Sequence, residues 1–80
     1  MAKPFEKGSV EWEMYTAFFM ISKKYWTPNM KDPHAYWDGF IHDIGALYQQ
    51  KYQPFGRILG RTLSDYLHNK FEEVQKNANA

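Results

Sequence analysis

The stretch DPHAYWDGFIHDIGALYQQK, residues 32–51, decides the fold, because it carries the pattern of one amphipathic helix from its cap to its end. Asp32 suits the N-cap, and Pro33 suits the first helical position, where its missing N–H has no intrahelical partner anyway. One broad apolar stripe holds Tyr36, Trp37, Phe40, Ile41, Ile44, Leu47 and Tyr48. The pattern predicts a helix over residues 33–51. Gly39 and Gly45 each cost about 1 kcal/mol relative to alanine, so either the helix is weak there or another backbone approaches closely.

Upstream of this stretch, residues 10–26 predict another helix, with Ser9 as its N-cap and glutamates near its first turn. This segment has two apolar stripes, roughly 140° apart on a helical wheel. The first stripe holds Val10, Met14, Ala17, Phe18, Ile21 and Tyr25. The second stripe is aromatic and gathers Trp12, Tyr15, Phe19 and Trp26.

Downstream, residues 54–75 predict a third helix, because Pro54 fits a first turn and disfavours helical geometry at Gln53. Its buried face is predicted to hold Phe55, Leu59, Thr62, Leu63, Tyr66, Leu67 and Val74, bordered by Gly56 and Gly60. Its solvated face is predicted to hold Arg57, Arg61, Ser64, Asp65, His68 and Glu72.

The domain organisation follows from length and composition. The chain has 80 residues and no cysteine, so neither disulfides nor a thiolate metal site can hold it together. Aromatic residues make up 19% of it and supply the apolar area that packing requires. Consecutive helices joined by short connections pack as neighbours. We expect one all-α domain over residues 1–80, a compact three-helix domain with a flexible arm at residues 1–8 and a disordered tail at residues 77–80.

Charge and hydropathy argue against several classes of protein. No apolar run approaches the roughly 18 residues of a membrane span, and the N-terminal MAKPFEKGS lacks the apolar stretch of a signal peptide. A net charge of +1 gives no general attraction to nucleic acid or to an anionic membrane. We therefore expect a cytoplasmic protein with no membrane partner.

The candidates for chemistry are His34, Asp38 and His42, because residues at this spacing lie along one side of a helix. The two histidines are about 12 Å apart along the axis, too far for one ion whose ligands lie at about 2 Å. The spacing predicts a solvated polar face and no metal site. Nothing indicates a nucleophile paired with its base, and the glycines form no phosphate loop. We expect no cofactor and no enzymatic activity.

Nucleic-acid binding is an alternative, because two helices joined by a short turn can form a helix-turn-helix. Arg57 and Arg61 would then be the outward residues that contact the duplex. The same face carries acidic residues four positions after basic ones, which predicts the intrahelical pairs Arg61–Asp65 and His68–Glu72. Because no basic cluster surrounds the arginines, this function is the second choice.

Four segments carry a resemblance to a family. They are EKGSVEW at residues 6–12, KKYWTPN at 23–29, AYWD at 35–38 and SDYLHNKFEE at 64–73. From Phe5 to Glu73 the chain resembles small helical proteins carried in accessory regions of bacterial mobile elements such as conjugative transposons. The resemblance implies a bacterial cytoplasmic accessory protein, and it brings no catalytic residue to this sequence.

The favoured function is that of a helical protein-interaction module, because the aromatic load exceeds what one small core requires. The aromatic residues predicted to make the contact, with a second copy or another protein, are Trp12, Tyr15, Phe19 and Trp26. The competing interpretation is that residues 10–26 lie between the other two helices and use both stripes in the core.

Overall fold

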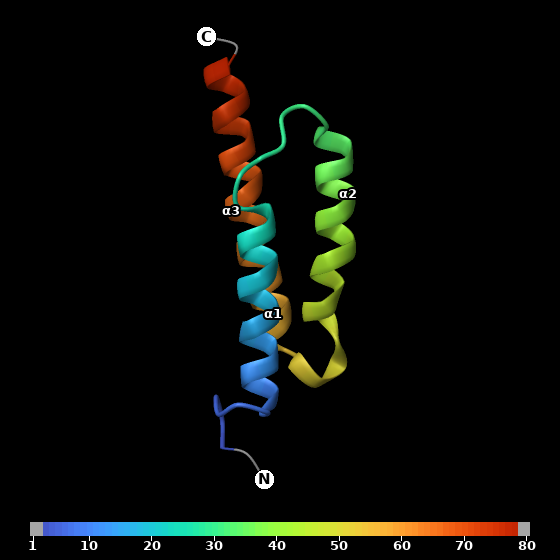
Figure 1. Cartoon of the computed structure of the whole chain (residues 1–80), viewed down its shortest axis with the longest axis vertical. Helices are drawn as coiled ribbons and strands as arrows, with labels where there is room; N and C mark the ends of the chain where they lie inside the picture. Colours follow the sequence, from blue (N-terminus) through green and yellow to red (C-terminus); the bar gives the residue numbers. More distant parts are fainter. Residues whose placement is uncertain (1–2, 79–80) are drawn as a thin grey trace.

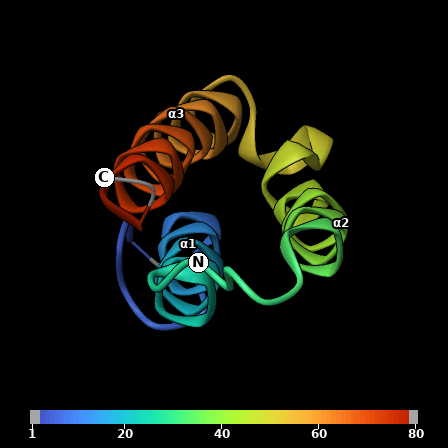
Figure 2. The same ribbon diagram turned by 90° about the horizontal axis from the view of Figure 1, so that it is seen from above.

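The computed structural model describes residues 3–78, which form three α-helices, two 3-10 turns and no strand. The helices are α1 (Val10–Tyr25), α2 (Pro33–Ile44) and α3 (Phe55–Ala78), and the turns are η1 (Gly45–Tyr48) and η2 (Gln50–Tyr52). α1 and α3 run in the same direction, and α2 runs antiparallel to them (Figure 1). Seen along the long axis, the three helices stand at the corners of a triangle (Figure 2). The predicted all-α three-helix domain is confirmed.

The starts of α1 and α2 follow from local sequence. Ser9 Oγ accepts a hydrogen bond from the Trp12 N–H at 3.1 Å, and Asp32 Oδ1 accepts one from the Ala35 N–H at 3.1 Å. Pro33 occupies the beginning of α2, as predicted. Each cap satisfies a backbone donor that has no partner inside its helix, which fixes where the helix begins.

α2 ends earlier than the sequence predicted. The helix expected over residues 33–51 stops at Ile44, and the chain continues through the two 3-10 turns to Tyr52. Gly45 explains this end, because glycine is a weak helix former and no atom from another part of the fold lies within 4 Å of the position its Cβ would take. The tighter turns reverse the chain ahead of α3 and leave Leu47 completely buried.

The two ends of the chain also differ from simple expectation. α3 continues past the predicted end at residue 75 to Ala78, so Asn77 and Ala78, placed in the predicted tail, lie in the helix. Residues 79–80 of that tail and residues 1–2 of the predicted arm lie outside the described residues. Within the rest of the arm, the Phe5 ring packs on Tyr15 with centroids 5.2 Å apart.

No helix within residues 3–78 combines the length and apolar character that crossing a bilayer requires.

The core lies where the three helices and the 3-10 turns meet. Its buried side chains are Met14, Ile21, Tyr25, Tyr36, Phe40, Ile44, Leu47, Tyr52, Leu63, Leu67 and Phe71. Several residues predicted on buried stripes are exposed, namely Val10, Ile41, Tyr48, Phe55, Tyr66 and Val74. Tyr52 and Phe71 are buried although the sequence stripes did not include them. Each helix is covered over a narrow sector, so the edges of the predicted stripes stay in solvent.

Two glycines give a matched test of this packing. A Cβ at Gly56 would collide with the Leu47 carbonyl oxygen and lie 2.8 Å from Tyr52 Cβ, whereas Gly45 has open space and helical φ of −55°. We expect Gly56→Ala to lower the free energy of unfolding by about 1 to 3 kcal/mol. Gly45→Ala should raise it by about 0.4 to 1 kcal/mol, because alanine restricts the unfolded chain. Urea unfolding of both variants checks the opposite signs, and equal effects would contradict the close approach at Gly56.

Candidate functional site

The four aromatic residues of the second stripe are half-exposed, and none of them belongs to the buried core. We call them the aromatic face; their exposed fractions are 44% for Trp12, 36% for Tyr15, 62% for Phe19 and 46% for Trp26. α1 does contact both other helices, but the side chains that it buries belong to the first stripe. The interpretation that α1 uses both stripes in the core is therefore wrong.

An apolar groove lies between α1 and α3, and three residues of the aromatic face, Tyr15, Phe19 and Trp26, help to line it. It has a volume of about 520 Å³. Its lining residues are Tyr15, Phe18, Phe19, Ser22, Trp26, Thr62, Leu63 and Tyr66. None of these side chains is charged. Ser22 Oγ donates its hydrogen bond to the Phe18 carbonyl oxygen at 2.7 Å, so its hydroxyl proton is already used inside α1. The groove therefore offers mainly apolar and aromatic contact.

Aromatic contacts join α1 to α3 at both ends of this groove. Tyr15 packs against Phe55 with ring centroids 5.9 Å apart, and Trp26 stacks on Tyr66 at 5.1 Å. Lys70 Nζ lies 4.3 Å from the Trp26 ring centroid and donates to the Trp26 carbonyl oxygen at 2.6 Å. From Tyr15 to Trp26, α1 advances about 17 Å, the length of three helical turns.

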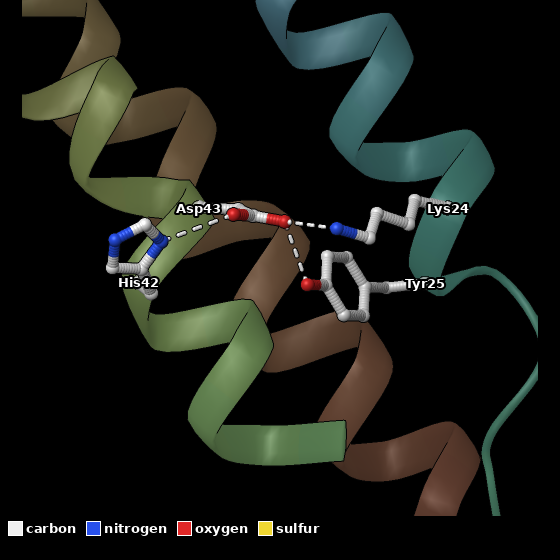
Figure 3. A network of polar contacts seen from close by, with 4 residues as sticks. All are labelled: Lys24, Tyr25, His42 and Asp43. Atoms are coloured by element: carbon white, nitrogen blue, oxygen red, sulfur yellow. Dashed lines mark hydrogen bonds and ion pairs between the residues drawn. The ribbon is translucent and has the colours of Figure 1, made fainter. Parts of the chain in front are cut away.

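A polar cluster on another side of α1 attaches it to α2 (Figure 3). In this Asp43 network, Asp43 Oδ2 accepts hydrogen bonds from Lys24 Nζ at 2.8 Å and Tyr25 Oη at 2.6 Å. Asp43 Oδ1 lies 3.3 Å from His42 Nδ1. The Lys24 ammonium is the main cause that lowers the pKa of Asp43, with Tyr25 and His42 adding to it. Tyr36 Oη also donates to the Tyr25 carbonyl oxygen at 2.6 Å. The network is a structural connection between two helices.

The histidines considered for a metal site do not converge. His34 Nε2 lies 3.1 Å from Asp38 Oδ2, while His42 faces the next residue, Asp43, instead of Asp38. Among residues 3–78, no group of three or more histidine, cysteine, aspartate or glutamate side chains could hold one ion.

The arginines considered for nucleic-acid binding lie exposed on α3. The predicted pairs Arg61–Asp65 and His68–Glu72 are absent from the ion pairs of the described residues. His68 instead stacks on Trp37 with centroids 4.1 Å apart, and its Nδ1 lies 2.8 Å from the Ser64 carbonyl oxygen. The prediction for His68 was wrong because its ring packs on a residue of α2, a contact between helices that i, i+4 spacing does not show.

The sequence identified the side of the groove that α1 forms as a separate aromatic stripe, but it did not identify the side that α3 forms. Tyr66 was assigned to the buried face of α3, but it is 49% exposed and lines the groove. The periodicity of the third helix could not show that Tyr66 lines a groove. That depends on how far α1 extends along α3, which is a matter of how the two helices are placed. Comparisons with protein-family models, curated proteins and solved structures found no match to this chain.

The Asp43 network predicts a specific pH dependence. Because the folded state lowers the pKa of Asp43, its contribution to stability is present above the ordinary value of about 4 and is lost as the pH falls below it toward the folded value. Asp43→Asn should lower the free energy of unfolding by about 1 kcal/mol at neutral pH, and the difference from the wild type should shrink in acid.

Urea unfolding at a series of pH values measures this difference. Asp38→Asn is the control, because the exposed His34–Asp38 pair should contribute less than about 0.5 kcal/mol. A deficit of Asp43→Asn that stays constant from neutral pH to about pH 2 would contradict the role of the charge.

Proposed function

We propose that this chain is a non-catalytic helical module that binds a protein through the aromatic face and the adjoining apolar groove. The observation that carries the proposal is the exposure of Trp12, Phe19 and Trp26, of which the last two line a groove that contains no charged side chain. Large contiguous apolar patches are uncommon on monomers and mark interaction sites. Tryptophan and tyrosine are also enriched among the residues that dominate interfaces.

The spacing of the aromatic face favours a helical occupant. Trp12, Phe19 and Trp26 follow each other at intervals of seven residues, and Tyr15 and Ser22 lie three residues after the first two. This is the spacing of a heptad seam, in which the contact residues of one helix follow a partner helix at a small crossing angle. An amphipathic helix placed in a groove is a common mode of recognition. The proposed partner element is therefore an apolar helix of about three turns.

Rigidity of the groove supports the same proposal. The Asp43 network holds α1 to α2, and the Trp26–Tyr66 stack with Lys70 holds the end of α1 to α3. A surface that is formed before binding loses less conformational freedom when the partner arrives. The resemblance to accessory proteins of bacterial mobile elements adds the proposal that the module acts in a bacterial cytoplasm.

Adjacent residues of α1 provide a matched test. Phe19 is 62% exposed and lines the groove, whereas Met20 is 57% exposed and lies outside it. At micromolar concentration, Phe19→Gln and Met20→Gln should each change the free energy of unfolding by at most about 0.5 kcal/mol, as surface substitutions do. Leu67→Ala, in the core, should cost about 2 to 5 kcal/mol.

Binding is measured with a benzophenone amino acid placed at position 19 or 20 in cells that produce the protein. Irradiation should give one discrete adduct from position 19 and none from position 20. Loss of cooperative unfolding in Phe19→Gln would assign Phe19 to the core, and equal labelling at both positions would contradict a specific interface.

Nucleic-acid binding through Arg57 and Arg61 is the second candidate, favoured by one observation. Neither arginine forms an ion pair within residues 3–78, so both guanidinium groups are available to phosphates. Two cations on one helix fall short of the clustered positive field that such proteins carry.

We therefore expect the double variant Arg57→Gln/Arg61→Gln to change stability by less than about 1 kcal/mol. We also expect no tight duplex DNA complex of the wild type at physiological salt. Fluorescence anisotropy with a labelled duplex measures the second point. A tight, salt-sensitive complex that this double variant abolishes would reverse the order of the two functions.

A further inference from the structure

We propose that the N-terminal arm, residues 3–8, is a strap that covers one end of the aromatic face and is displaced when a partner binds there. The proposal rests on the function proposed above and adds its regulation by the chain itself. It is carried by the position of the Phe5 ring, the backbone conformation of the arm and the few contacts that hold the arm in place.

The Phe5 ring lies on the aromatic face. Its centroid is 5.2 Å from that of Tyr15, which belongs to the aromatic face and also lines the groove. The hollow of about 540 Å³ beside this ring is lined by Phe5, Trp12, Tyr15, Thr16 and Phe19. A helix that follows the aromatic face from Trp26 to Trp12 would cross Tyr15 and meet the Phe5 ring. The arm therefore occupies surface that the proposed partner requires.

The arm holds Phe5 in a backbone conformation that phenylalanine disfavours. The Glu6 N–H donates to the Lys3 carbonyl oxygen at 3.0 Å, which closes a β-turn with Pro4 and Phe5 at its centre. Proline fixes a negative φ, and Phe5 has a φ of 69°, which together define a type II turn. Glycine or asparagine normally occupies the position of Phe5 in such a turn, because other side chains are strained there. Strain of this kind persists only where a contact compensates for it, and the contact of Phe5 is with the Tyr15 ring.

Little else holds the arm against the helices. Within the described residues, its other polar contacts are local: the Lys3 N–H donates to Glu6 Oε2 at 3.3 Å, and the Ser9 N–H donates to the Glu6 carbonyl oxygen at 2.9 Å. No charged side chain of the arm is among the ion pairs of residues 3–78. The Phe5 ring is itself 58% exposed. One half-exposed ring favours the closed arm and the strained turn opposes it, so the arm opens at a small cost in free energy.

A weakly closed strap reduces the affinity of a partner by a modest factor. Only the open fraction of the molecules can bind, so the apparent dissociation constant is the intrinsic one divided by that fraction. A partner that covers Tyr15 replaces the contact of the Phe5 ring and lets the turn relax to an unstrained conformation. Any change that releases the arm should therefore strengthen binding.

Two substitutions release the arm in different ways. Gly8 has a φ of 93°, and no atom from another part of the fold lies within 4 Å of the position its Cβ would take. Gly8→Ala therefore strains the closed arm without a collision and without altering a ring. Phe5→Ala removes the ring and leaves the strained turn without compensation. Gly45→Ala is the matched control, because Gly45 has the same open space but a φ of −55°.

Amide hydrogen exchange of the purified protein measures the closed arm. The Glu6 amide of the wild type should exchange about 3- to 20-fold more slowly than an unfolded amide, and much faster than the interior of α1. Phe5→Ala and Gly8→Ala should remove this protection, and Gly45→Ala should keep it. Protection equal to that of the α1 interior would overturn the strap, because the arm would then be a fixed part of the fold. No protection in the wild type would also overturn it, because the arm would not be closed.

The adduct from the benzophenone at position 19 measures the competition. In a dilution series of cell lysate, Phe5→Ala and Gly8→Ala should reach half of the maximum yield at a lysate concentration about 3-fold lower or more. This shift should match the protection that the Glu6 amide loses, since both report the ratio of closed to open arm. Gly45→Ala should give no shift.

The outcomes separate this inference from the proposed function. A discrete adduct in the wild type that both arm variants leave unchanged or weaken would overturn the strap, assign Phe5 to the binding surface and leave the interaction module standing. The absence of a discrete adduct from every variant would overturn the proposed function together with its regulation.

Discussion

The close approach of α3 to the 3-10 turn η1 is the constraint on which the remaining packing depends. At Gly56, the first turn of α3 contacts the backbone carbonyl of Leu47, which a side chain would prevent. One turn later, a Cβ at Gly60 would lie 3.3 Å from Ile44 Cγ1. This approach places α3 directly against η1, where Leu47 is completely buried. α1 buries Met14, Ile21 and Tyr25 against the rest of the domain. Its aromatic face stays outside the core.

The position of α1 is defined by contacts of different kinds on its different sides. Toward α2, the Asp43 carboxylate collects an ammonium and a phenol in one small network. Toward α3, the Lys70 ammonium donates to the carbonyl oxygen of Trp26, the C-cap residue of α1, and covers the Trp26 ring. A cation at this position also interacts favourably with the negative end of the helix dipole. These directional contacts fix the rotation of α1, which apolar packing alone would leave less defined. The same rotation decides which aromatic residues remain exposed.

Local features of the fold could be predicted from the sequence, and non-local ones could not. The caps Ser9 and Asp32 and the 3.6-residue period act within a few residues, so three helices and the starts of α1 and α2 followed directly. The end of α2 depends on whether another helix supports Gly45, and no periodicity carries that information. The stacking of His68 on Trp37 replaced an expected ion pair for the same reason. For the candidate site, sequence identified the aromatic face, but the opposite wall required the relative placement of α1 and α3.

The absence of charge from the groove lining has a kinetic consequence. Complementary charges accelerate the encounter of two proteins, and without them association proceeds at about 10⁵ to 10⁶ M⁻¹ s⁻¹, limited by the need to meet in the correct orientation. The chain as a whole adds little long-range attraction, because its net charge is +1. A complex formed on this surface would therefore owe its strength to slow dissociation, and its lifetime would be set by how well aromatic rings fill a fixed shape.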